Sequence, residues 1–178
     1  KLEGVHMKQI KPYLFPIIVL IFFDQIIKAF IGLFFMDLDF DIIGKLLRFS
    51  PVQNINLSYG GNFISILSNF WVMVLFNILV ILLLVSGYNF YKTKRQHTSY
   101  SVKVIITCGL SGTLCSLLDK VLWGGSLDFL QIPTVFTFDL KDIYLTIAEI
   151  IFVIIGVFHS KEISVKEYLS FCYRRLKR

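Results

Sequence analysis

The chain has 178 residues, of which 56% are hydrophobic and 17% are charged, and its formal net charge is +6. A soluble domain has about 45–50% apolar and about 25% charged residues, so this composition excludes an ordinary soluble protein and indicates an integral membrane protein. The basic residues lie beside the apolar runs, which favours a positive-inside topology over nucleic-acid binding. The length is that of one domain.

The chain begins with KLEGVHM, and we interpret residues 1–6 as an expression-tag remnant that precedes Met7. The first apolar segment, Tyr13–Phe35, contains Asp24 and Lys28 and has no small-residue cleavage site. It is therefore expected to be a retained transmembrane helix rather than a signal peptide. Asp24 and Lys28 are four residues apart, so they share one helical face and can pair.

The segment after this helix, MDLDFDIIG at residues 36–44, alternates apolar and acidic residues. A period of two predicts a short strand with one wet face. The D-x-D-x-D spacing is similar to that of a calcium loop, but the sixth position is Ile42 instead of Gly and the twelfth is Arg48 instead of Glu. Those positions make the turn and supply the bidentate ligand, so we predict no metal site here.

Three further apolar segments approach the length of about 20 residues that a helix needs to cross the hydrocarbon core. They are Phe70–Tyr88, Val102–Trp123 and Asp142–Phe158. The Val102–Trp123 segment is rich in small residues, which allow close helix approach in lipid, so we expect it to be central in the bundle. The expected fold class is an all-α membrane protein with four transmembrane helices and a small extracytoplasmic loop region that contains β-structure.

Basic residues concentrate in the N-terminal flank, in residues 91–103 and at the C-terminal end. The positive-inside rule predicts that these regions and both termini are cytoplasmic, which leaves residues 36–69 and 124–141 on the outer face. Residues 7–160 form the expected helical domain. Residues 161–178 form a basic cytoplasmic tail, which is either an amphipathic helix on the inner membrane surface or a solvated end.

Several kinds of active site are excluded by the residues present. The three cysteines have no spacing that indicates a disulfide framework or a metal site, so we expect reduced packing residues. The three histidines lie in the N-terminal remnant, in the expected inner loop and at the expected inner end of the last crossing. A Ser-His pair and a histidine-rich zinc site are therefore not available at the outer face, and no nucleotide-binding glycine motif occurs.

Carboxylates near the outer ends of the crossings are the remaining candidates. Asp128 follows a Gly-Gly break after the third crossing and Asp142 begins the fourth, so the two are expected to meet. Like charges at close range raise one pKa, which leaves one acid and one base near neutral pH. Such a pair can activate water and protonate a leaving amine, as in an aspartic peptidase. The alternatives are solvated loop carboxylates and, for Asp24, Lys28, Asp119 and Lys120, structural ion pairs near the outer interface.

These residues resemble the bacterial lipoprotein signal peptidase family, signal peptidase II, over roughly residues 12–160. The first crossing contains DQIIK, which matches D-Q-x-x-K, and the outer loop contains NLSYGGNFISIL, which is similar to N-x-G-A-A-F. The stretch CSLLDKVLWGGSLDF is similar to G-N-x-x-D-R followed by V-D-F. The fourth crossing opens FDLKDIYLTIAEI, which is similar to F-N-x-A-D-x-x-I.

The resemblance implies a four-helix aspartyl endopeptidase of the bacterial inner membrane, with Asp128 and Asp142 as its catalytic pair. It implies a diacylglyceryl-modified prolipoprotein substrate, cleaved before the lipidated Cys, and a short outer sheet that cradles this substrate. We expect membrane lipid as a partner, a monomer, no nucleic acid and no cofactor. The positions expected to bind substrate or to support the pair are Asp24, Lys28, Asn56, Gly60, Asn62, Phe63, Ser116, Asp119, Lys120 and Asp139.

The match departs from the family pattern around the expected pair. The outer-loop Asn has no clean equivalent, because Ser58 occupies its place while Asn54 and Asn56 lie nearby. An added negative charge would raise the pKa values of the pair, and added lysines would oppose this effect. The other departures are Cys115 for Gly, Ser116 for Asn, Lys120 for Arg, Asp139 for Asn and Lys141 for Ala.

Two other functions stay open at this point. The first is a catalytically altered relative that binds lipidated peptides or lipid without cleavage. The second is a small transporter or proton-coupled protein in which Asp24, Asp119 and Glu149 relay ions, although a relay needs ionisable groups toward both faces. Glu149 lies deepest among these groups, and we expect it to hydrogen-bond to the small face of the third helix or to be protonated in the core.

Overall fold

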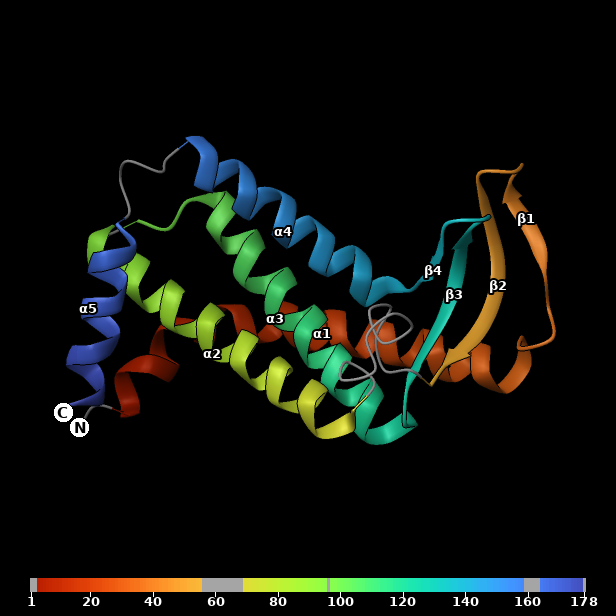
Figure 1. Cartoon of the computed structure of the whole chain (residues 1–178), viewed down its shortest axis with the longest axis horizontal. Coiled ribbons are helices and arrows are strands. Elements are labelled where there is room, and N and C mark those ends of the chain that lie inside the picture. Colours follow the sequence, from red (N-terminus) through yellow and green to blue (C-terminus); the bar gives the residue numbers. More distant parts are fainter. Residues whose placement is uncertain (1–2, 56–68, 96, 159–163, 178) are drawn as a thin grey trace.

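The structure, a computed structural model, describes residues 3–55, 69–95, 97–158 and 164–177. These residues form a bundle of long helices with a small sheet at one end and a short helix at the other (Figure 1). The elements in chain order are α1 (Glu3–Phe34), β1 (Phe40–Ile43), β2 (Leu47–Asn54), α2 (Phe70–Lys94), α3 (Tyr100–Trp123), β3 (Ser126–Ile132), β4 (Phe136–Phe138), α4 (Leu140–Phe158) and α5 (Val165–Leu176).

Helix α3 is central in the bundle, because it packs against α1, α2 and α4. The prediction from its small residues is therefore confirmed. A Cβ atom on Gly112 would lie 2.6 Å from Cγ of Leu145 and 3.0 Å from the backbone oxygen of Lys141. Glycine at this position thus lets the first turns of α4 lie directly against α3.

The outward faces of the helices are apolar, as a lipid-facing surface requires. Phe15 of α1, Leu82 of α2 and Phe152 of α4 are exposed by 78%, 60% and 65%. Among the described residues, three helical stretches are long and apolar enough to cross a membrane: Ile10–Phe34, Phe70–Lys94 and Tyr100–Trp123. The fold is thus mostly helical, with three candidate membrane helices and a small antiparallel sheet. The fourth crossing, through the 19 residues of α4, stays a prediction.

The sheet is antiparallel with the order β1-β2-β3-β4. Leu127 and Phe129 of β3 pack with Ile31 near the end of α1 and join the sheet to the bundle. Side chains alternate between the two faces of a strand, so Ser126 and Asp128 lie on the face opposite to Leu127 and Phe129. Packing of the apolar face therefore fixes where these two polar side chains point.

The predicted strand in residues 36–44 is present as β1, but it has no dry face. All four of its residues are exposed. Strand β1 is the edge of the sheet, beyond the end of the helical bundle, so the bundle does not cover either of its faces (Figure 1).

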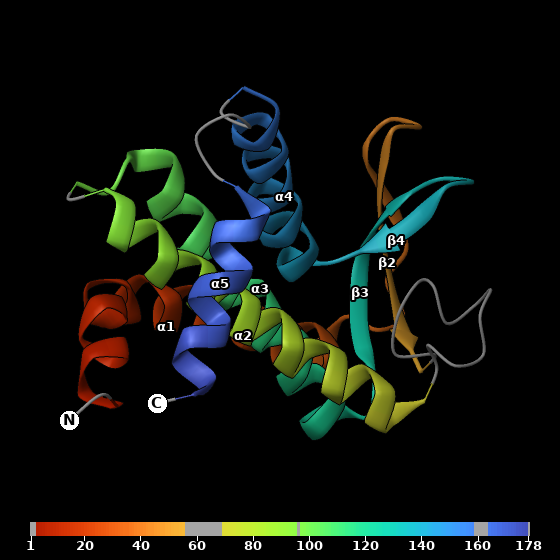
Figure 2. The same ribbon diagram turned by 60° about the vertical axis from the view of Figure 1, so that its left-hand side comes forward.

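The tail forms α5, which lies against α2 at the end of the molecule far from the sheet (Figure 2). The Ser86 and Tyr168 hydroxyls are 2.6 Å apart, and Lys94 pairs with Glu167 at 2.8 Å. Of the two predicted forms of the tail, the helix is therefore confirmed over Val165–Leu176. Its place on the inner membrane surface stays a prediction.

The expectation for Glu149 is wrong. Tyr144 and Ala148 of α4 are buried, and the Cβ of Ala148 would lie 3.7 Å from a Cβ on Gly109 of α3. The next residue is turned by about 100° on a helix, so Glu149 lies on the exposed side of α4 instead of against α3.

Candidate active site

A buried cluster of carboxylates and lysines lies where α1, α3, β3 and the start of α4 meet. Asp24, Asp119 and Asp139 are fully buried, and Lys28 is 1% exposed. Buried charges are stable only when they are paired, so their contacts define the site. The cluster consists of Asp24, Lys28, Asp119, Lys120, Ser126, Asp128, Asp139, Lys141 and Asp142.

Lys28 is the centre of the inner half of this cluster. Its Nζ atom lies 2.9 Å from Asp24, 2.7 Å from Asp119 and 2.8 Å from Asp139. The predicted pairing of Asp24 with Lys28 is confirmed. The same amino group also joins α1 to α3 and to the residue before α4.

Gln25 completes this arrangement. Its Nε2 atom donates to Asp24 and to Asp119, both at 3.0 Å, and its Oε1 atom accepts from the Trp123 indole at 3.1 Å. Gln25 belongs to the D-Q-x-x-K motif, but the sequence reasoning did not select it as a site residue. The motif itself was the signal that could have found it.

The start of α4 is fixed by a reciprocal pair of backbone contacts between Asp139 and Asp142. The Asp142 N–H donates to the Asp139 carboxylate at 3.2 Å, and the Asp139 N–H donates to the Asp142 carboxylate at 3.2 Å. This is the pattern of a capping box, here with Asp at both positions. It holds the Asp142 carboxylate at the helix N-terminus, where the helix dipole favours negative charge.

Asp128 is held from both sides on β3. Ser126 donates to one carboxylate oxygen at 2.8 Å, and Asn54 of β2 donates to the other at 3.2 Å. Asn54 lies opposite Ser126 in the strand register. Burial raises the pKa of Asp128 above its ordinary value of 3.8, against the opposing effects of Lys141 and of the two hydrogen bonds. Sequence reasoning did not select Ser126, although strand alternation places it on the same face as Asp128.

The carboxylates of Asp128 and Asp142 meet at the end of the bundle. One oxygen from each of Asp128, Asp139 and Asp142 lies within 4.8 Å of the others. The Lys141 Nζ atom forms an ion pair with Asp139 and lies 3.7 Å from Asp128 and 3.9 Å from Asp142. The side chain of Asp142 is 41% exposed and that of Asp128 is 6% exposed, so water reaches Asp142 while Asp128 is buried.

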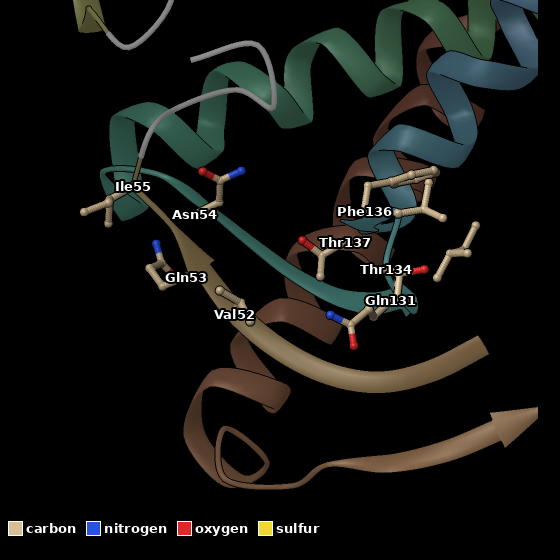
Figure 3. A pocket seen from close by; sticks show the side chains of 10 residues that line it. Val52, Gln53, Asn54, Ile55, Gln131, Thr134, Phe136 and Thr137 are labelled. Carbon is tan, nitrogen blue, oxygen red and sulfur yellow. The ribbon is translucent and has the colours of Figure 1, made fainter. Parts of the chain in front are cut away.

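An open pocket of about 390 Å³ adjoins the site between the end of β2 and the β3–β4 turn (Figure 3). Val52, Asn54 and Ile55 line one side, and Gln131, Phe136 and Thr137 line the other. Asn54 lines the pocket and also donates to Asp128, so the pocket and the carboxylate pair share a residue.

The remaining sequence candidates are placed differently. Lys120 is buried, and its Nζ atom donates to the backbone oxygen of Ser116 at 3.1 Å and to the Ser116 hydroxyl at 2.7 Å. Both residues are on α3, one turn apart, and their contact satisfies the buried ammonium within the helix. Four other candidates lie outside the described residues: Asn56, Gly60, Asn62 and Phe63.

Replacing Gly125 by Ala is expected to lower the thermal unfolding temperature in detergent. A Cβ atom there would lie 2.5 Å from the backbone oxygen of Asn54, so β2 must move away from β3. Forced overpacking of this kind costs about 1–3 kcal/mol. Gly87→Ala in α2 is the matched control, because a Cβ atom there would meet no described atom within 4 Å apart from its own helix backbone. Equal unfolding temperatures for the two variants would contradict the close approach of β2 and β3.

The fold and the site define a multi-pass membrane protein with a carboxylate pair at one end of its helical bundle. Comparison with known proteins places this arrangement in a family. Residues 16–158 match the signal peptidase (SPase) II family, and the chain belongs to that family. It is therefore a peptidase of lipoprotein processing, as the resemblance in its sequence implied.

Individual relatives agree with this assignment. The chain is 30% identical over 126 residues to the lipoprotein signal peptidase of Caldicellulosiruptor bescii, with 69% of this chain and 75% of the relative covered. Two bacterial membrane enzymes solved by the in meso method share the fold. One, at 2.3 Å resolution, has a TM-score of 0.70 and 20% identity, covering 88% of this chain and 93% of the other. The second, at 1.9 Å resolution, has a TM-score of 0.66 and 22% identity, covering 82% of this chain and 92% of the other.

Proposed function

We propose that the chain is an intramembrane aspartyl endopeptidase that removes the signal peptide from diacylglyceryl-modified prolipoproteins. It cleaves the peptide bond before the lipidated Cys, and Asp128 and Asp142 activate the attacking water. The observation that carries this proposal is the convergence of these two carboxylates within 4.8 Å, in a chain of the signal peptidase II family.

The environments of the two aspartates suit different roles. Asp128 accepts hydrogen bonds on both oxygens from uncharged donors, which favours its ionised form, and its raised pKa lets it hold a proton that it takes from water. One oxygen of Asp142 lies within 4.8 Å of an oxygen of Asp128, and the like charge of an ionised Asp128 favours the protonated form of Asp142, which can then supply the proton that the leaving amine needs. Water oxygen attacks the scissile carbonyl carbon while Asp128 takes a proton. Asp142 then protonates the amine of the lipidated Cys as the C–N bond breaks.

The surroundings of the pair suit a substrate that is part lipid and part peptide. The pocket between β2 and the β3–β4 turn combines apolar side chains with the amides of Asn54 and Gln131. Apolar outward faces on α1, α2 and α4 hold the bundle in lipid and leave the cluster at its end. We place the protein in the bacterial inner membrane as a monomer, with four crossings, cytoplasmic termini and the site toward the outer face.

Cleavage by the reconstituted protein tests this proposal. The full chain in liposomes is expected to convert a diacylglyceryl-modified prolipoprotein into a free signal peptide and a product with an N-terminal lipidated Cys, both identified by mass spectrometry. The same prolipoprotein without the diacylglyceryl group is the matched control and is expected to stay intact. A lipidated substrate that also stays intact would defeat the proposal.

A relative that binds without cleaving is the second candidate, because the Lys141 ammonium contacts the carboxylates of the pair. A cation held there favours ionisation of both aspartates, and a pair without a proton lacks the acid that the leaving amine requires. Retention of intact lipidated substrate by the unmutated protein would favour this reading over the first.

A further inference from the structure

We propose that Lys141 is a positioning residue of this site and that, with Asp139, it forms a built-in ion pair that sets the charge balance of Asp128 and Asp142. The inference rests on the proposed function, and it concerns two positions at which the chain departs from the family pattern. Lys141 is 5% exposed and Asp139 is fully buried, so neither charge is solvated by bulk water.

Lys141 acts on Asp128 directly and through Ser126. Its ammonium donates to the Ser126 hydroxyl oxygen at 2.6 Å, and that hydroxyl donates to Asp128 at 2.8 Å. A hydroxyl has one proton to donate. Because Lys141 occupies the Ser126 oxygen as an acceptor, the single proton of Ser126 is directed at a carboxylate. Three carboxylates lie within reach of this hydroxyl, Asp128 at 2.8 Å, Asp139 at 3.1 Å and Asp119 at 3.3 Å, and Asp128 is the nearest. Lys141 therefore keeps the Ser126 hydroxyl oriented as a donor toward these carboxylates.

Asp139 keeps Lys141 in this place. Its carboxylate pairs with Lys141 and, at 2.8 Å, with Lys28 of α1. The two departures from the family pattern thus add one positive and one negative charge in contact, and the net charge of the site is unchanged. Either change alone would add one unbalanced charge to the buried site, which is costly. Lys141 and Asp139 are therefore expected to act together, so that replacing both should disturb the site less than replacing either one.

Every charged group around Asp128 and Asp142 contributes to the charge balance of these two carboxylates. The Lys141 ammonium faces Asp119 of α3 at 3.3 Å, in addition to Asp128, Asp139 and Asp142. Lys28 of α1 pairs with Asp139 and with Asp24, and Lys120 of α3 is nearby. At Asp128, Lys141 lowers the pKa and Asp139 raises it. Removing the two charges one at a time should therefore shift the pKa of Asp128 in opposite directions.

The pH dependence of cleavage by Lys141→Met, Asp139→Asn and the double variant tests this balance. Asparagine is a good N-cap, so Asp139→Asn removes the charge and keeps the start of α4. Lys141→Met is expected to move the acid limb of kcat to higher pH by about one unit, because the carboxylates lose their cation. Asp139→Asn is expected to move it to lower pH, and the double variant to return close to the parent protein.

Charge removal elsewhere is the matched control. Lys94→Met with Glu167→Gln deletes an exposed ion pair between α2 and α5, far from the site, and should leave the acid limb in place. Shifts of the two single variants in the same direction would overturn the proposal. So would a lower kcat without any shift, which is what a purely structural role predicts.

An infrared titration separates failure of this inference from failure of the proposed function. The difference between spectra of the parent protein and of Asp128→Asn isolates the carboxyl band of Asp128, and it requires no cleavage. The midpoint of this band is expected to rise in Lys141→Met and to fall in Asp139→Asn. A protein that does not cleave but shows these opposite shifts would refute the function and keep the inference. An unmoved midpoint would refute the inference alone.

Discussion

Replacing Asp142 by Asn is expected to reduce kcat for the lipidated prolipoprotein by roughly 10³-fold or more, because general acid–base catalysis contributes about 10²–10⁴-fold and both partners of the pair are needed. Asparagine keeps an oxygen that can accept from the Asp139 N–H, so the start of α4 should persist. The variant should therefore unfold near the temperature of the parent protein. Turnover is measured by substrate depletion, and folding by thermal unfolding in the same detergent.

Asp128→Asn should lose activity to a similar extent but with a larger effect on structure. Asp128 accepts from both Ser126 and Asn54, and the amide nitrogen of an asparagine side chain would meet one of these donors. Asp41→Asn on the exposed strand β1 is the matched control, since it removes a carboxylate of the sheet away from the cluster. Full activity of Asp142→Asn, with proof that no parent protein is present, would refute the two-aspartate mechanism.

The inner half of the site followed from local sequence rules. Asp24 and Lys28 are one helical turn apart, and that spacing is enough to predict their contact. The central position of α3 followed from its small residues, and the meeting of Asp128 with Asp142 followed from the Gly-Gly break and the start of the next helix. Each prediction needed only helix geometry and the order of the crossings along the chain.

The contacts of Asn54 and Lys141 with the carboxylate pair depend on segments that lie far apart in the sequence. Asn54 reaches Asp128 because of the register between β2 and β3, which apolar packing of β3 on α1 fixes. Sequence reasoning selected Asn56 instead of Asn54 for that reason, and Asn56 lies outside the described residues. The central place of Lys141 was equally out of reach, because it depends on how closely Gly112 lets α4 approach α3.

Two expectations failed where local pattern and tertiary surroundings disagree. The alternation in residues 36–44 predicts a strand with one dry face, but β1 is an edge strand whose four residues are all exposed. Glu149 is in an apolar segment, which predicted a polar partner inside the bundle. Its neighbour Ala148 occupies the face toward α3 instead, so the orientation of α4 decided the outcome.

Replacing Lys28 by Met is expected to destabilise the protein by about 3–5 kcal/mol, the cost of breaking a buried ion pair by removing one partner. The carboxylates of Asp24, Asp119 and Asp139 lie within 2.9 Å of its Nζ atom, and each of them would lose this partner. Asp119 and Asp139 also contact Lys141, whereas Asp24, among the described residues, is left with the uncharged Gln25 amide and Cys115 thiol. Asp24 should therefore be the carboxylate that suffers most from the loss.

This asymmetry predicts a rescue. Adding Asp24→Asn to Lys28→Met removes the buried charge with the poorest remaining partners, and replacing both members of a buried pair costs much less than breaking it. The double variant should recover a large part of the unfolding temperature that Lys28→Met loses, while Lys94→Met, whose ion pair is exposed, should change it little. If the double variant is no more stable than Lys28→Met alone, then Lys28 holds the fold through Asp119 and Asp139, and its pairing with Asp24 within α1 contributes little.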